Sequence, residues 1–185
     1  MNALPDVIEL GPEEEAQRLW IGATEAYGSA NEDLVALFES LDLGLRAAEI
    51  LAMHKLQAVK ADFPATIQLQ LDTPEADIDV HRDAINIPNT LNFTAVLDLL
   101  SNDDLECVSP GMHRGWEDRS FACKRSRGTA RAALGVSLSE EQREQLLVLA
   151  AYRNRIFRTP PPLKVEPGRI TGAWGALKGL VEGLL

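Results

Sequence analysis

The sequence has few of the residues from which common active sites are built. It contains 2 cysteines and 3 histidines among 185 residues, and aromatic residues make up 5%. Cys107 and Cys123 form no CxxC pair and no zinc-binding spacing, so reduced thiols are the default expectation and a disulfide between them stays open. No nucleophile elbow, phosphate-binding glycine loop, dinucleotide fingerprint or zincin helix occurs. These absences argue against enzymes of those types, and we expect no cofactor.

Long apolar runs are also missing. No uninterrupted apolar segment approaches the roughly 20 residues that a membrane span needs, and the first residues lack the basic region and apolar run of a secretion signal. We therefore expect a cytoplasmic protein without membrane contact. With 185 residues, 45% of them hydrophobic, the chain can bury a sizeable core, and its length favours a single domain over residues 1–185.

Acidic residues dominate, but they are unevenly distributed. Residues 1–110 carry 21 Asp and Glu against 5 Lys and Arg, a net charge of −16, whereas residues 111–185 carry 7 against 13, a net charge of +6. The first part should repel nucleic acid, and the second could attract a phosphate backbone or an acidic partner. Alternatively, the two parts neutralise one another within one fold or across a dimer.

Helical patterns cover most of the chain. Gly11-Pro12, followed by three glutamates, predicts the start of a first helix. Asn31 is the expected cap of a long second helix whose apolar residues keep helical spacing up to Pro64, and Gly44 is a point where this helix could kink or split. A further helix is expected from about Asn92, with Phe93, Val96, Leu97 and Leu100 on its inner face. The pattern predicts a mainly all-α fold, a helical bundle of about five to six helices.

Residues 65–90 depart from the helical pattern. From Ile67 to Leu71 apolar residues alternate with polar ones, which predicts a short extended or β-like excursion. In a strand, Asp77, Asp79 and His81 would share one face and present two carboxylates and an imidazole. This set is a candidate magnesium or manganese site. The alternative, which we favour, is a solvated polar face without a metal.

A basic stretch runs from His113 to Arg131. Trp116 and Phe121 interrupt its cations, and in such a pattern the cations can bind phosphates while the rings stack on bases. The alternative is a basic loop that leads into a helix, with the two aromatic side chains anchored in the core. The cations are Arg114, Arg119, Lys124, Arg125, Arg127 and Arg131.

The most informative stretch is residues 139–158. Ser139 and Gln142 predict a capping box at the start of a helix, which should pack against the long helix of residues 31–62. Arg153 falls in the middle of the apolar stripe of this helix. Because a buried guanidinium without a partner is costly, we expect Arg153 to be substantially buried and paired with a carboxylate of the acidic half, backbone carbonyls, a ligand or a second subunit. The apolar members of the stripe are Leu146, Leu149, Ala150, Ile156 and Phe157.

Leu138–Gln142, Leu146–Ala150 and Tyr152–Phe157 together resemble the last core helix of the HEPN superfamily. The resemblance implies a small helical domain of a kind common in prokaryotic toxin–antitoxin and antiviral systems, many of which are metal-independent ribonucleases. It also implies a dimer in which paired helices bring two copies of Arg153 and Asn154 together. The family signature continues with a histidine. This chain has Arg158 there, and arginine cannot relay a proton at physiological pH.

Three hypotheses follow. The favoured one is a catalytically degenerate HEPN-like module that forms a homodimer and binds RNA, a nucleotide or a protein partner. The second is an active ribonuclease with a relocated base, in which Arg153, Asn154 and His113 would be catalytic. The third is an interaction protein, such as an immunity protein, an antitoxin or a complex subunit, which binds through its acidic half without nucleic acid. For the first hypothesis, the expected ligand-binding residues are Arg153, Asn154, Arg155, Arg158, Arg114, Lys124, Arg125 and Arg127.

The last residues predict one more helix, with two different faces. The apolar face comprises Ile170, Trp174, Leu177, Val181 and Leu184, and it should pack on the core. The opposite face carries glycine, which permits close approach of a partner helix but costs helix stability. The alternative is a marginal helix that frays. The glycines are Gly172, Gly175, Gly179 and Gly183.

Overall fold

The computed structural model describes residues 10–30, 33–63, 68, 71–72, 93–100, 124–158 and 165–185; of residues 94, 95, 98, 124–126 and 154–158 it describes the backbone alone. Within these ranges all regular structure is helical, which confirms the all-α prediction. The elements are α1 (Pro12–Ser29), α2 (Leu34–Ala58), a 3-10 turn η1 (Lys60–Asp62), α5 (Phe93–Leu100), α6 (Lys124–Leu134), α7 (Glu140–Arg158) and α8 (Pro167–Leu184).

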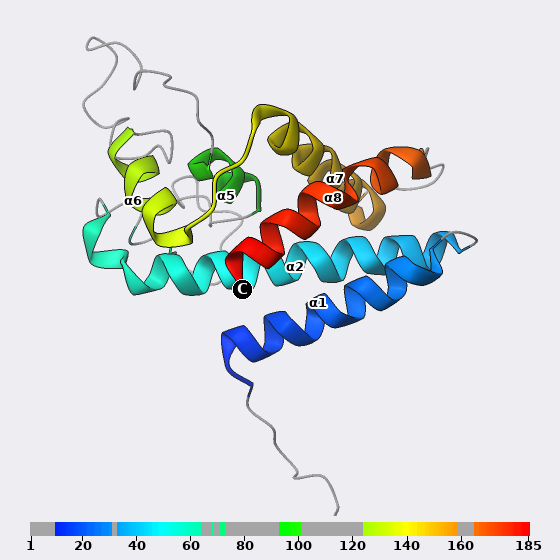
Figure 1. Ribbon diagram of the computed structural model, residues 1–185, viewed down its shortest axis with the longest axis horizontal. Helices are drawn as coiled ribbons and strands as arrows, with labels where there is room; N and C mark the ends of the chain where they lie inside the picture. The colour runs from blue at the N-terminus through cyan, green and yellow to red at the C-terminus, as the bar shows by residue number, and fades with distance from the viewer. Residues whose placement is uncertain are drawn as a thin grey trace, which may run out of the picture.

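The long helix α2 lies at the centre of the described bundle. The helix α1 packs along it as the other arm of a hairpin, and α8 crosses it on a neighbouring side (Figure 1). The helices α5, α6 and α7 also contact α2, and α7 packs chiefly along α8. The predicted contact between α7 and α2 is therefore present, but α8 provides the larger share of the packing of α7. None of the described helices is both long and apolar enough to cross a bilayer.

The N-termini of α1 and α2 are each fixed by a hydrogen bond from a backbone N–H to an acidic side chain. Pro12 occupies the first turn of α1 as predicted, and the backbone N–H of Gly11 donates to Glu14 at 3.1 Å. The cap of α2 is Asp33, whose carboxylate accepts from the backbone N–H of Val35 at 2.8 Å. The prediction that Asn31 caps this helix was therefore wrong. Asp and Asn are comparably good caps, so residue type alone did not decide which of the two the chain would use.

Gly44 neither splits α2 nor interrupts its hydrogen bonding, because α2 is continuous from Leu34 to Ala58. It marks a close contact between helices instead. A Cβ atom at this position would lie 2.9 Å from Cδ2 of Leu177 on α8 and 3.5 Å from the ring of Trp20 on α1. The absence of a side chain at Gly44 thus lets α8 approach α2, and this approach brings the last helix into the core.

The core is built mainly from leucine and alanine on the inward faces of the helices. The predicted inner face of α5 is confirmed, because Phe93, Val96, Leu97 and Leu100 are all buried. On α8 the predicted apolar face is likewise confirmed. Its buried members are Ile170, Ala173, Trp174, Ala176, Leu177, Leu180, Val181 and Leu184.

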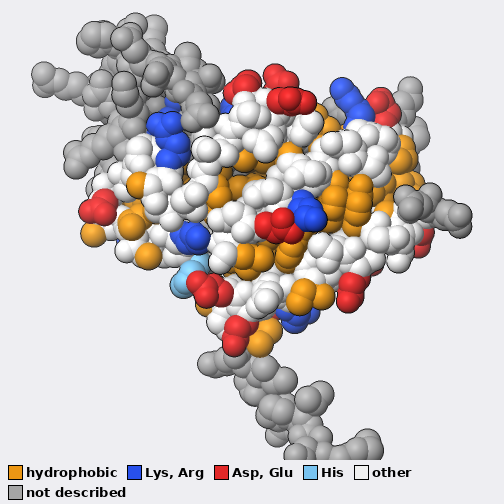
Figure 2. Space-filling view, viewed as in Figure 1, with side chains coloured by type: hydrophobic (Ala, Val, Ile, Leu, Met, Phe, Trp, Pro, Cys, Tyr) orange, Lys and Arg blue, Asp and Glu red, His pale blue; other side chains and the backbone are white. Residues whose placement is uncertain are grey.

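Stacked aromatic rings connect α8 to α1. The ring centroids of Tyr27 and Trp174 lie 4.1 Å apart with an interplanar angle of 4°. Trp20 stacks on Trp174 as well, at 5.6 Å and 18°. Stacked rings add to the free energy of apolar burial. Figure 2 shows hydrophobic side chains gathered along the middle of this face of the molecule, over α8 and its neighbours.

The glycine face of α8 is mostly open in the described part of the chain. Beyond the helix's own backbone and adjacent residues, no atom lies within 4 Å of the Cβ position at Gly172, Gly175 or Gly179, and all three are exposed. Gly183 differs, because a Cβ there would lie 2.6 Å from Cγ1 of Val136. Of the four glycines on this face, only Gly183 is required by contacts with the described residues.

Only three positions between residues 65 and 90 are described, and all three are helical. Gln68, Leu71 and Asp72 therefore contradict the extended backbone predicted for them, while the rest of the segment lies outside the described residues. Leu71 is buried and Asp72 is exposed. A strand and one edge of a helix give the same in–out pattern over two neighbouring positions, so alternation alone could not distinguish them.

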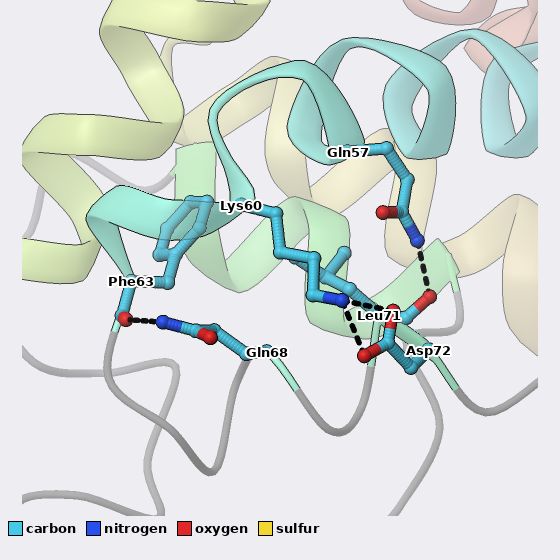
Figure 3. A network of polar contacts seen from close by, with 6 residues as sticks. All are labelled: Gln57, Lys60, Phe63, Gln68, Leu71 and Asp72. Carbon is cyan, nitrogen blue, oxygen red and sulfur yellow. Dashed lines mark hydrogen bonds and ion pairs between the residues drawn. The ribbon is translucent and has the colours of Figure 1, made fainter.

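Residues at the end of α2, in the turn η1 and directly after it hold these positions in place. Gln57 donates to the backbone carbonyl of Leu71, and Lys60 forms an ion pair with Asp72 (Figure 3). The side-chain amide of Gln68 donates to the carbonyl of Phe63 at 2.7 Å.

Candidate functional site

The helix α7 begins with the predicted capping box, which sets the register of everything after it. The backbone N–H of Ser139 donates to the side chain of Gln142 at 2.9 Å, and the backbone N–H of Gln142 donates to the hydroxyl of Ser139 at 3.2 Å. In this register Leu146, Leu149 and Ala150 are buried, as predicted. Arg153 follows Leu149 and Ala150 on the same face, since residues three and four apart are neighbours on a helix.

Arg153 is paired with a carboxylate of the acidic half. Its two terminal nitrogens donate to the two oxygens of Glu49 on α2, over distances of 2.9 Å and 2.7 Å. The side chain of Arg153 is 16% exposed and that of Glu49 is 22% exposed. Both parts of the prediction for Arg153 are therefore confirmed: its side chain is substantially buried, and a carboxylate binds it with the fork geometry typical of strong arginine–carboxylate pairs.

The same carboxylate also receives a hydrogen bond from the backbone. The N–H of Phe93, the first residue of α5, donates to Oε1 of Glu49 at 3.2 Å. An α-helix leaves its first N–H groups without partners in the helix, and its N-terminus carries a partial positive charge. The negative charge of Glu49 thus faces positive groups from both α7 and α5. The pair joins α2, α5 and α7 at one point.

A second arginine–glutamate fork on the surface provides a comparison. Arg18 donates to both oxygens of Glu15 at 2.9 Å and 2.7 Å, within α1 and in contact with solvent. The hydrogen bond from Arg18, supported by the charges of Arg18 and Arg46, lowers the pKa of the Glu15 carboxyl from its usual value, although desolvation opposes this shift. Exposed pairs of this kind contribute little to stability. The Glu49–Arg153 pair has the same chemistry in a largely buried position.

The geometry around Arg153 provides charge and hydrogen bonds but no proton relay among the described side chains. Arginine stays protonated at physiological pH, and Glu49 is occupied by its two donors. His54 is on the surface of α2, where its ring lies 3.7 Å from Glu13 of α1. The arrangement can hold a negative group in place.

The structure describes only some of the side chains of the predicted basic surface. Arg127 was expected to bind a ligand, but its side chain is buried in the structure at 6% exposure, so it does not belong to an exposed basic face. The reason lies in its register, because Ala130 and Leu134 follow it at helical spacing on the buried side of α6. The rule that predicted the burial of Arg153 applies equally to Arg127.

The remaining predicted site residues are placed by their backbone or not at all. Lys124 and Arg125 lie in the first turn of α6, and Asn154, Arg155 and Arg158 lie in the last turns of α7, but their side chains are outside the described residues. His113 and Arg114 are entirely outside them, as are Asp77, Asp79 and His81. Among the residues that the structure describes, no group of three or more His, Cys, Asp or Glu could hold a metal ion.

Glu49 is the site residue that sequence reasoning did not name. The sequence predicted a carboxylate of the acidic half, but the first 110 residues contain 21 acidic side chains. A signal was present, because Glu49 directly follows Ala48 and lies four residues after Leu45, at the margin of the apolar stripe of α2. An acidic residue at the edge of one helix's buried stripe can reach a cation in the middle of the buried stripe of a second helix that packs against it. No family model, curated protein or solved structure matches this chain, so the site is interpreted from its own chemistry.

Proposed function

We propose that this chain is a catalytically inactive, HEPN-like helical module that dimerises and acts by binding a protein partner. The observation that carries the proposal is the fork between Arg153 and Glu49. An arginine that serves RNA cleavage must present its guanidinium to a phosphate, and here a carboxylate of the same chain holds that position. The presence of Arg158 where the HEPN signature has histidine supports the same conclusion, since arginine provides no general base.

The surface charge of the described helices favours a protein over a nucleic acid as the partner. Glu14 and Glu25 project from one face of α1, and Glu39 is exposed on α2. Exposed carboxylates repel a phosphate backbone and attract a basic protein surface. Arg127, one of the cations that RNA binding would use, is buried. By its resemblance, such a module belongs in a toxin–antitoxin or defence system.

The first test is RNA cleavage. Purified wild-type protein should degrade labelled RNA no faster than Arg153→Ala, in the presence of a chelator and with equal protein concentrations. General acid–base catalysis contributes about 10²–10⁴-fold, so an active enzyme would be clearly separated from this background. Metal-independent cleavage that disappears in His113→Ala would refute the proposal and establish the ribonuclease with a relocated base.

The second test concerns the partner. Light scattering after gel filtration should give a dimer mass, and the wild-type chain should show no binding to RNA that weakens steeply with salt. A protein partner captured by the wild type should be lost from Glu14→Lys/Glu25→Lys/Glu39→Lys and retained by the control Lys178→Glu, an exposed charge reversal on α8. Strong, salt-dependent RNA binding would instead support the RNA-binding form of the module.

A further inference from the structure

The carboxylate of Glu49 lies where two groups of a kind that binds anions meet. Two groups from different helices converge on it: the guanidinium fork of Arg153 on α7, and the backbone N–H of Phe93 at the N-terminus of α5. An arginine fork and a helix N-terminus are each common ligands of phosphate groups in proteins. Here they form one site, and an anion of the chain itself fills it.

The internal anion comes from a third helix. Glu49 reaches the site from α2, whereas the groups that bind it belong to α5 and α7, so rotation of a single side chain would empty the site without removing either donor. The site is not sealed, because Glu49 is 22% and Arg153 is 16% exposed. Part of each side chain is therefore in contact with solvent.

We infer that Arg153 and the N-terminus of α5 form an oxyanion-binding site which Glu49 closes from within, and that a phosphate group is the external ligand that competes with Glu49. A phosphate group near neutral pH carries about −1.5 to −2 charges, against one on the carboxylate. It can accept from both nitrogens of the fork and from the backbone N–H at once. Binding of phosphate would break the contact between α2 and α7, so occupancy of the site and the packing of these helices are linked.

This competition predicts how strongly inorganic phosphate binds. If the wild-type pair opens in about 1–10% of molecules, phosphate should bind the wild type about 10–100 times more weakly than a variant that has lost the carboxylate. The competition does not depend on which partner the module binds or on any activity. The proposed function and this site can therefore fail separately.

The experiment compares three variants of the full chain by calorimetry and thermal unfolding in sodium phosphate, with sodium chloride at matched ionic strength as reference. Glu49→Ala should bind phosphate, and its melting temperature should rise with phosphate concentration, because a ligand that binds only the folded state stabilises it. Glu49→Ala/Arg153→Gln should lose both effects. The matched control is Glu15→Ala, which breaks a two-bond arginine–glutamate pair on the surface and should create no site.

Glu49→Gln serves where Glu49→Ala fails to fold, since it removes the charge but keeps an oxygen for the N–H of Phe93. Phosphate should also bind this variant more tightly than the wild type. Two outcomes would overturn the inference: a folded Glu49 variant that binds no phosphate, or equal phosphate affinity in the wild type and the variant. The first would leave the pair as a structural clamp, and the second would show that Glu49 does not compete.

Discussion

At the scale of single residues, the decisive feature is a cation placed in an apolar stripe. Burial of Arg153 is tolerated because Glu49 accepts from both terminal nitrogens of its guanidinium and neutralises its charge. Removal of one partner from such a pair leaves the other desolvated and without its counter-charge, which costs more than the pair itself contributes. The stability of the fold should therefore depend on Glu49 more than on any exposed carboxylate.

Urea unfolding of Glu49→Ala tests this dependence. We expect the free energy of unfolding to fall by about 2–3 kcal/mol. Removal of one partner from a fully buried pair costs about 3–5 kcal/mol, and the loss should be smaller here because both side chains keep some contact with solvent. Glu15→Ala is the control. It removes the same side-chain atoms from a helical glutamate that pairs with an exposed arginine, Arg18, and it should lower the free energy of unfolding much less. Equal effects of the two substitutions would show that the Glu49–Arg153 pair is not a structural link.

At the scale of elements, glycine has opposite roles in α2 and α8. Gly44 is required, because a methyl group there would meet the fully buried Leu177 and the ring of Trp20. No described residue of another segment lies within 4 Å of the Cβ position at Gly175 or Gly179, and their helix gives up the favourable helix propensity of alanine. The same residue type is thus a packing requirement in one helix and a cost in another.

Alanine substitutions should separate these roles. Gly175→Ala and Gly179→Ala should each raise the free energy of unfolding by about 0.5–1 kcal/mol, because they fill no occupied space and favour the helix. Gly44→Ala should lower it by about 1 kcal/mol, since the strain of overpacking, about 1–3 kcal/mol, exceeds the gain in propensity. Guanidinium unfolding of the three variants measures both signs. A destabilised Gly175→Ala would indicate that a second molecule packs against this face.

At the scale of the whole molecule, the aromatic stack connects the first and last described helices. Trp174 stacks on both Tyr27 and Trp20, so α8 is held to α1 as well as to α2. Glu49 and Arg153 form a second long-range link between the acidic and the basic parts of the chain. Segments far apart in sequence are therefore joined by both apolar and charged contacts.

Replacement of Trp174 tests the apolar link. Trp174→Ala should lower the free energy of unfolding by about 3–5 kcal/mol and should weaken the near-ultraviolet circular dichroism of the packed rings. Trp174→Phe is the matched control, because it keeps an aromatic ring in contact with Tyr27 and Trp20 and should retain most of the stability. An unchanged near-ultraviolet spectrum in Trp174→Ala would show that the rings are not fixed against one another in solution.

The sequence by itself determined the helical class, the apolar faces of α5 and α8, the burial of Leu146, Leu149 and Ala150 on α7, the capping box at Ser139 and the burial of Arg153. Each of these follows from local spacing, since residues three and four apart share a helix face whatever the rest of the chain does. The same spacing in α6 indicates that Arg127 is buried, because Ala130 and Leu134 follow it on the same face. It failed at Gln68, Leu71 and Asp72, where too few positions distinguish a helix from a strand.

Tertiary structure alone decided which groups meet. Glu49 was one of 21 acidic residues in the first 110, and only the crossing of α2, α5 and α7 selected it as the partner of Arg153. From the sequence, Gly44 was a position where α2 could kink or split. In the structure it is the position where α8 packs closely against α2. The physical reason is common to both cases. Periodicity states which face of a helix is buried, but the pairing of faces depends on the distances and angles between helices, and no local pattern in the sequence encodes these.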